Sequence, residues 1–410
     1  MKLHVDQLVR IEPAHRPTAA ARHPMPPGRE PVASDQPVSL RVAYLATQGD
    51  GSGDEARISE LLAPLNPTRL HFDRSRKVSS SAAALSGILR NRPDVVVMEG
   101  TGVAGGAAVV AARLLTGVPY VVSSGDAVGP YLGRISPWLS APGRVYERLL
   151  CRLSAGYIGW SPYLVGRAIT LGARRGMTAA HWCSEGPVSE QERHARRAQT
   201  RRRLGIPETA LVVGLVGSLK WNQKRRYAYG LELIEAIRRT TRDDLRVLIV
   251  GDGTGRQRLE ARAGGDSRVL LPGAVPRPQV ASMLAAMDVA SLPQSLDEVG
   301  ALRYTTKLTE YVAAMVPVVT GQLPVAYDLD DGWMWRIAGA APWDQHYVAG
   351  LARFLEQLDR SEVATRRARV PRRPAVFDFA RQQRAVSAFV TDASSAAPNG
   401  TPVPRSEEGL

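Results

Sequence analysis

The sequence predicts an α/β protein built from two doubly wound, Rossmann-like domains. Short apolar runs rich in β-branched residues alternate with helical patterns along most of the 410 residues. These runs do not alternate polar with apolar residues, which is typical of parallel strands that helices cover on both faces. With 44% hydrophobic residues, a chain of this length can bury two separate cores.

The two ends of the chain differ in composition from the rest. Residues 1–38 hold seven prolines and show no apolar periodicity, so we expect a disordered leader. Residues 392–410 are rich in small residues and proline, and we expect a disordered tail. No apolar run reaches the roughly 18 residues of a spanning helix, and no signal peptide is evident. We therefore expect a cytoplasmic protein; its net charge of +14 leaves peripheral contact with the inner face of an anionic membrane open.

The apolar runs give the expected strands in order. An N-terminal domain over residues 39–190 takes the runs at 40–45, 94–98, 119–123 and 155–160. A C-terminal domain over residues 209–375 takes the runs at 211–216, 245–250, 268–271, 287–292 and 316–320, and a helix is expected at 231–237. The arginine-rich stretch 191–208 indicates a basic linker, and we expect 376–391 to form a helix that packs back on the N-terminal domain.

One helix start carries the clearest functional signal. Lys307 and Glu310 lie three residues apart and so share a helix face, beside the backbone N–H groups of Thr305 and Thr306. A lysine at a helix N-terminus suits a phosphate, and a carboxylate one turn further can accept hydrogen bonds from sugar hydroxyls. The pair predicts a seat for a nucleoside diphosphate, although a surface ion pair on an amphipathic helix has the same spacing.

A cationic turn follows the first strand of the second half. It begins with Gly217 and Ser218 and places four cations within seven residues. Because the carboxyl ends of strands collect ligands in doubly wound folds, we expect Lys220 and Lys224 to contact the diphosphate.

A second glycine-rich turn follows the first strand of the chain. Gly51 and Gly53 would let the backbone approach a phosphate or a sugar closely. A mobile surface turn is the alternative, and the stretch is not a P-loop.

Other kinds of site find little support. Two cysteines, Cys151 and Cys183, cannot build a disulfide scaffold or a four-thiolate zinc site. The motif Asp328-Leu-Asp330 is more typical of a turn than of metal binding, so we expect no metal site. The arginine runs lack interleaved aromatic residues; they indicate solvated helix faces or linkers rather than a nucleic-acid partner.

Five blocks of the second half resemble the retaining glycosyltransferases of family 4, which have the GT-B fold of two Rossmann-like domains facing across a cleft. The blocks are Gly-x-Leu…Lys at 217–224, Val-Gly-Asp-Gly at 250–253, Leu-Pro-Gly-x-Val at 271–275, Met-Asp-Val-x-x-Leu-Pro at 287–293 and Lys-Leu-x-Glu-Tyr-x-Ala-x-x-x-Pro-Val-Val at 307–319. The first half resembles the family only in its architecture and in residues 146–158.

The resemblance implies roles for single residues. Lys307 matches the family's diphosphate lysine, and Glu310 matches the glutamate that holds the ribose hydroxyls. Lys220 or Lys224 stands near the family's second phosphate cation, whereas Ser218 occupies the place of its usual arginine.

Further positions match the family less closely. The block that ends at Val275 would place backbone atoms against the base. Where the family often has a second glutamate this chain has Leu302, and Asp297 or Glu298 would have to reach the sugar instead. Where the family often has a histidine, Asp126 is the candidate for a contact with the sugar or the acceptor.

From the resemblance we expect transfer of a sugar from a UDP- or GDP-sugar to an acceptor hydroxyl, with retention of anomeric configuration and without a metal or cofactor. The first half would bind the acceptor, which is either a lipid-linked or cell-envelope glycan or a small secondary metabolite. Two alternatives stay open: a non-catalytic nucleotide-sugar-binding protein, and a sugar-nucleotide 2-epimerase, which needs acids and histidines in its cleft.

Overall fold

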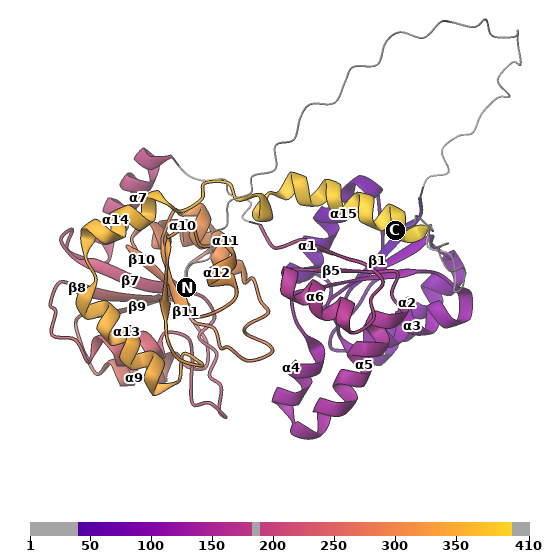
Figure 1. Ribbon diagram of the computed structural model, residues 1–410, viewed down its shortest axis with the longest axis horizontal. Helices are drawn as coiled ribbons and strands as arrows, with labels where there is room; N and C mark the ends of the chain where they lie inside the picture. The colour runs from indigo at the N-terminus through magenta and orange to yellow at the C-terminus, as the bar shows by residue number, and fades with distance from the viewer. Residues whose placement is uncertain (1–39, 183–188, 396–410) are drawn as a thin grey trace, which may run out of the picture. The chain divides into compact units, whose positions relative to one another are not determined.

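The computed structural model describes residues 40–182 and 189–395, and it contains two parallel β-sheets with interleaved helices (Figure 1). Each sheet contributes to two separate clusters of buried apolar residues, one on each face. The predicted class of two doubly wound domains is therefore confirmed. The expected leader at 1–38, Cys183 and most of the expected tail lie outside the described residues.

The first sheet joins six strands of the described chain in the order β2-β1-β3-β4-β5-β6. Its central strands are buried along their whole length, and they pair valine with valine, as at Val42 opposite Val95. Branched side chains of this kind pack well between neighbouring strands. The strands are β1 (Val42–Ala46), β2 (Thr68–Arg69), β3 (Val95–Glu99), β4 (Tyr120–Ser124), β5 (Gly156–Gly159) and β6 (Gly176–Thr178), and the helices are α1 (Gly53–Leu62), η1 (Ala63–Leu65), α2 (Lys77–Asn91), α3 (Val103–Thr116), α4 (Val128–Ile135), η2 (Pro137–Leu139), α5 (Ser140–Leu153) and α6 (Pro162–Thr170).

The second sheet also joins six strands among the described residues, in the order β12-β11-β10-β7-β8-β9. β7 and β8 run in register over six residue pairs, from Leu211 opposite Leu245 to Val216 opposite Val250. Its strands are β7 (Leu211–Val216), β8 (Leu245–Val250), β9 (Val269–Gly273), β10 (Val289–Leu292), β11 (Val318–Gly321) and β12 (Met334–Ile337). The helices in this part of the sequence are α7 (Glu190–Arg203), α8 (Leu231–Ile237), α9 (Arg256–Ala263), α10 (Arg277–Ala285), α11 (Thr306–Ala313), α12 (Val325–Asp328), α13 (Gln345–Gln357), α14 (Arg360–Ala368), η3 (Ala375–Phe377) and α15 (Phe379–Ser394).

The predicted strands agree with the observed ones to within two residues, and β7, β8 and α8 have the predicted bounds. Three edge strands, β2, β6 and β12, were not predicted. They are two to four residues long, and β2 and β6 contain no buried residue. Without an apolar run, β2 and β6 leave no signal in the sequence; β12 is apolar except for Arg336 and was missed.

Helix α15 belongs to the core of the first sheet, although it follows the whole of the second sheet in the chain. Val386, Val390 and Ala393 are fully buried in the cluster that holds Ile58 and Leu61 of α1. Figure 1 shows α15, in yellow, alongside α1. Among the described residues, none of the helices is both long enough and apolar enough to cross a membrane.

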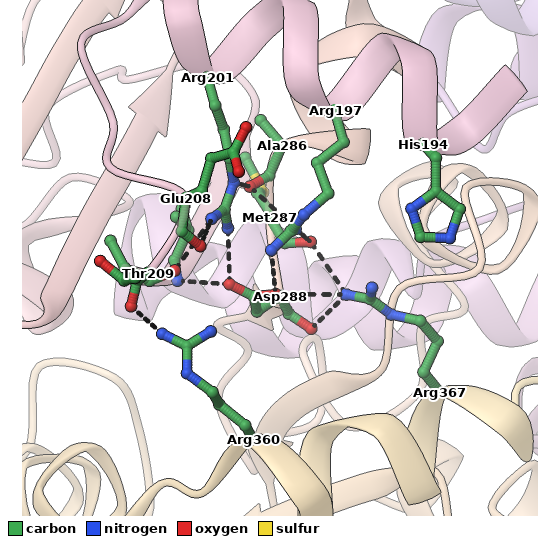
Figure 2. Close-up of polar contacts among 12 residues, drawn as sticks. His194, Arg197, Arg201, Glu208, Thr209, Ala286, Met287, Asp288, Arg360 and Arg367 are labelled. Carbon is green, nitrogen blue, oxygen red and sulfur yellow. Dashed lines mark hydrogen bonds and ion pairs between the residues drawn. The ribbon is translucent and has the colours of Figure 1, made fainter. Parts of the chain in front are cut away.

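The arginine-rich stretch expected to be a solvated linker is a helix with buried arginines, so the interpretation as a solvated face was wrong for these side chains. Arg197 and Arg201 of α7 each place a nitrogen 2.7 Å from a carboxylate oxygen of Asp288 at the start of β10 (Figure 2). Arg367 of α14 lies 3.7 Å from the same carboxylate. The arginines also donate to the carbonyls of Ala286 and Met287 that end α10, which satisfies helix-terminal acceptors.

Candidate active site

The strand order of the second sheet indicates where a ligand would bind. β7 and β10 are neighbours, and the chain leaves them toward β8 on one side and toward β11 on the other. Loops that diverge in this way open a crevice at the carboxyl ends of the two strands. Here the crevice is bordered by residues 217–230, after β7, and 293–305, after β10. In the first sheet the chain diverges in the same way from β1 and β3.

Lys307 lies in the first turn of α11 and reaches back to the loop after β7. Its ammonium lies 4.8 Å from the ring centroid of Tyr229, at the distance of a cation–π contact. A Cβ at Gly217 would lie only 2.6 Å from Cε of Lys307. A side chain at position 217 would therefore displace the end of the lysine side chain from its observed position.

Lys307 and Glu310 are both partly buried, and neither has a hydrogen-bond or ion-pair partner within residues 40–182 and 189–395. Burial lowers the pKa of Lys307 and raises the pKa of Glu310, while the charge of each group opposes the shift of the other. Beside them, Oγ1 of Thr305 is buried and has no partner in the described chain, although this residue caps α11. Unpartnered polar groups at a helix N-terminus are what an anionic ligand would satisfy.

A cavity of about 1100 Å³ adjoins this helix terminus. From the second half it is lined by Arg303, Thr305 and Thr306, and from the first half by Asp54, Asp126 and Trp160 among others. Burial and the charge of Asp126 raise the pKa of Asp54. The cavity therefore has a cationic side near α11, while the first half lines it with charges of both signs, since Arg74 and Lys77 stand there with Asp54 and Asp126.

A buried ion pair under the cavity holds Trp160 in place. Arg57 and Glu99 are fully buried, with Nη1 of Arg57 2.9 Å from Oε2 of Glu99. Nε1 of Trp160 donates to Oε1 of Glu99 over 3.1 Å, and the Arg57 guanidinium lies 4.5 Å from the ring centroid. A Cβ at Gly125 would collide with this ring at 2.7 Å. Because so many contacts fix the indole, Trp160 offers a rigid apolar contact to a ligand.

Some predicted site residues lie away from Lys307. Lys220, Lys224 and Ser218 are exposed, and the ammonium of Lys224 donates to the carbonyls of Arg134 and Ile135 over 3.3 and 3.4 Å. Within the described chain, the charges that act on Lys307 are those of Glu310 and Arg303, not those of these lysines.

The glycine turn after β1 contributes to the cavity through other residues than the predicted ones. Gly51 and Gly53 are exposed and have open space around them, whereas Ser52 and Asp54 line the cavity. Gly51 has a φ of +76°, so its glycine serves the turn itself.

The acidic loop before α11 is engaged in other contacts. Asp297 accepts from the backbone N–H groups of Val299 and Gly300 and pairs with Arg134, and these bonds lower its pKa. Glu298 is half exposed and lies 3.0 Å from Arg144.

Two further predicted residues lie elsewhere around the crevice. Val275 is partly buried and packs against the apolar core of the second sheet, just after β9. Asp126 lines the cavity, as predicted for a substrate contact, but its carboxylate is paired with Arg303. None of these placements tests a role in binding, so the roles stay predictions.

Sequence reasoning missed Arg303, Tyr229, Trp160 and Asp54. Arg303 lies four residues before Lys307 but outside α11, which begins at Thr306, so helical spacing gives no signal for it. The other three are single residues in loops or at a helix start, and only the fold brings them together.

No cluster of three or more potential metal ligands was found in the part of the chain that the structure describes. Within the motif considered for a metal, Asp330 accepts from the backbone N–H groups of Gly332, Trp333 and Met334 through one carboxylate oxygen. These bonds are the turn chemistry expected for this motif.

Comparison with known protein families gives matches to both halves. Residues 210–356 match the family described as Glycosyl transferases group 1, and residues 14–180 match the Glycosyl transferase 4-like domain. A 2-deoxystreptamine glucosyltransferase of Streptomyces kanamyceticus is 29% identical over 201 residues, which cover 47% of this chain. The aligned part is 50% of that protein, so the similarity spans half of its length.

Solved structures share the fold at low sequence identity. HepE of Anabaena, in complex with UDP and glucose, superposes with a TM-score of 0.61 at 16% identity and covers 86% of this chain and 99% of its own. Sucrose-phosphate synthase of Thermosynechococcus elongatus gives a TM-score of 0.64 at 14% identity, covering 87% of this chain and 100% of its own.

Proposed function

This chain is a family 4-like glycosyltransferase of the GT-B fold, and from this premise we propose that it transfers a hexosyl group from a UDP- or GDP-sugar to an acceptor hydroxyl. The observation that carries the proposal is the pair Lys307 and Glu310 at the N-terminus of α11, near the cavity, neither of which has a hydrogen-bond or ion-pair partner among the described residues. The ammonium and the helix N–H groups would hold the diphosphate, and the carboxylate would hold the ribose hydroxyls.

In the proposed reaction the bond between the anomeric carbon and the diphosphate oxygen breaks, and a bond to the acceptor oxygen forms on the same face of the sugar. The hydroxyl proton passes to the departing diphosphate oxygen, so the products are a glycoside and a nucleoside diphosphate. Negative charge grows on the leaving group, where Lys307 would stabilise it. This route needs no protein nucleophile and no metal.

For the acceptor we propose a small polyol that carries amino groups. The relative from Streptomyces kanamyceticus is named for such an acceptor, 2-deoxystreptamine. In this chain, Asp54 lines the cavity with no hydrogen-bond or ion-pair partner in the described residues, and it would pair with an acceptor ammonium.

An acceptor in an anionic membrane is the second candidate. The hairpin of α4, η2 and α5 exposes Trp138 (89% exposed), Ile135 and Val145, and the exposed Arg148 and Arg152 lie on the same hairpin. Apolar side chains interspersed with arginine suit an anionic lipid surface. Flotation with phosphatidylglycerol vesicles would support this candidate if Trp138→Ser abolished binding and Leu114→Ser, at an exposed position of α3, did not.

Incubation of the purified protein with UDP-glucose or GDP-mannose tests the main proposal. With 2-deoxystreptamine present, we expect nucleotide release together with a glycoside whose anomeric coupling in NMR matches that of the donor, in the presence of EDTA. Inverted product would overturn the retaining mechanism. Binding without turnover would favour the non-catalytic alternative, and interconversion of the donor sugar at C2 would favour the epimerase.

A further inference from the structure

Arg303 occupies a position that the proposed donor site leaves without a role. It stands four residues before Lys307 and lines the same cavity. Its Nε and Nη2 both contact one carboxylate oxygen, Oδ1 of Asp126, which comes from the loop after β4. In the described part of the chain, the guanidinium makes no other hydrogen bond or ion pair, so most of its five N–H donors remain available.

The charge of Arg303 acts on the donor site itself. Burial lowers the pKa of Lys307, and the positive charge of Arg303, which precedes α11, lowers it further. Burial raises the pKa of Tyr229, whose ring lies against the Lys307 ammonium, and the charge of Arg303 opposes that shift. Mutual repulsion between partly buried cations is relieved when an anion lies between them.

The other cations expected at the diphosphate are poorly placed for it. Lys224 is exposed and donates to two backbone carbonyls, and Lys220 is exposed on the loop after β7. Arg303 is thus the basic side chain that shares both the cavity and the electrostatic surroundings of Lys307.

We propose that Arg303 is the second cation of the donor diphosphate and that Asp126 holds it in the absence of donor, so that donor and Asp126 compete for one guanidinium. This inference rests on the proposed function, since it assigns a residue to the same donor site. An arginine can bind two phosphate oxygens with parallel N–H bonds, which makes a diphosphate a better partner than a single carboxylate oxygen. Donor binding then frees Asp126, which lines the cavity, for the acceptor.

Calorimetric titration with UDP and with GDP tests the competition, because substitutions of the two partners, Arg303 and Asp126, should change the nucleotide affinity in opposite directions. Arg303→Gln should weaken nucleotide binding by about 10- to 100-fold. Asp126→Asn should tighten it several-fold, because the guanidinium no longer has to leave a charged partner. In the Arg303→Gln background, the gain from Asp126→Asn should largely disappear.

Three controls make the result specific. Asp54→Asn removes a negative charge from the same cavity without releasing Arg303, so it measures the general electrostatic effect and should give a smaller gain than Asp126→Asn. Arg303→Lys should recover part of the affinity, and Arg262→Gln, at an exposed arginine of α9, should leave it unchanged. Thermal unfolding of each variant shows whether it is folded.

The possible failures are distinct. If the wild-type protein binds neither nucleotide, the proposed function falls and this inference falls with it. If the wild type binds and Arg303→Gln binds equally well, only the assignment of Arg303 is overturned. If Asp126→Asn weakens binding, or gains no more than Asp54→Asn, the competition is overturned.

Discussion

Lys307 is the residue on which the proposed chemistry depends most, and its surroundings explain how a lysine is kept there without a carboxylate partner in contact. The flat face of Tyr229 attracts the ammonium, and Gly217 leaves space for the aliphatic chain. The partly buried position lowers the pKa of the amine, which means that the charged form is less stable there, without a ligand, than it is in water. A diphosphate would restore the lost stabilisation.

Replacing Lys307 with Ala should lower kcat/KM for transfer by at least about 100-fold, which is about 3 kcal/mol of transition-state stabilisation. Under the proposed function, the lost charge would be the one that stabilises the diphosphate oxygen on which negative charge develops. Steady-state kinetics with the preferred donor measures the effect, and Arg353→Ala, at an exposed position of α13, is the matched control. A variant that retained a third of wild-type kcat/KM would contradict the assigned role.

Glu232 predicts a pH-dependent stability that is unrelated to catalysis. It is buried, accepts from Tyr227 and from the N–H of Gly230, and burial raises its pKa from 4.5 to about 7. The folded protein therefore keeps a proton that the unfolded chain releases near its ordinary pKa. Below that pKa, Glu232 does not reduce the free energy of unfolding. As the pH rises to about 7, it lowers the free energy of unfolding by on the order of 3 kcal/mol.

Glu232→Gln should remove this dependence, because the amide can accept the same bonds without titrating. Urea unfolding at a series of pH values should show the variant and the wild type equally stable near pH 4.5, with the variant increasingly more stable up to about pH 7.5. If the free energies of unfolding of the two proteins changed in parallel with pH, Glu232 would have to ionise at its ordinary pKa in the folded state.

At the level of residues, the sequence predicted the part of the site that lies within one helix turn. Lys307 and Glu310 are neighbours on α11 because their spacing alone places them on one face. Asp54, Asp126 and Trp160 come from separate loops and helices of the first sheet, and only the strand order brings them to one cavity. No local pattern carries that information.

At the level of elements, the interior strands and the edge strand β9 were predictable, whereas the edge strands β2, β6 and β12 were not. β7 and β8 are flanked by strands on both sides, so nearly all of their residues are apolar and the run has clear limits. β2 is two exposed residues at a sheet edge. Helix α7 was misjudged because arginine usually indicates a solvent-exposed side chain. Arg201 is nevertheless only 1% exposed, since carbonyl groups and Asp288 surround it.

Asp288 should be among the most sensitive positions of the second sheet. Its carboxylate joins α7, α14 and the backbone N–H of Val212 in β7 (Figure 2). Asp288→Ala leaves the buried guanidinium of Arg201 without its counter-charge, which should destabilise the protein by about 3–5 kcal/mol.

Chemical denaturation measures this loss, and Asp244→Ala is the matched control. Asp244 pairs with Arg242 at 2.8 Å, but its side chain is 45% exposed. An exposed pair of this kind contributes up to about 1 kcal/mol. Equal losses for the two variants would show that burial of the Asp288 cluster adds nothing to its stability.

At the level of the whole molecule, the chain returns to its first sheet at the end. α15 buries Val386 and Val390 against residues of α1 and β3, and Gly156 of β5 lacks a side chain where the ring of Phe389 lies, 2.6 Å from a Cβ placed there. The first half of the chain therefore cannot complete its core until α15 has been made. The second sheet has no comparable dependence, since α15 supplies no residue to its two clusters.

Truncation after Asp378 removes α15 and keeps η3, whose Val376 and Phe377 pack against a cluster of the second sheet, so it should destabilise the first sheet selectively. The two valines alone account for roughly 3–6 kcal/mol of burial. Hydrogen exchange should show faster exchange in β1, β3 and β4 and little change in β7 and β8, whereas truncation after Ser395 should change neither. UDP affinity should fall less than about threefold if the donor site belongs to the second sheet. Equal acceleration in both sheets would show instead that the two halves unfold as one cooperative unit, with α15 as part of a shared core.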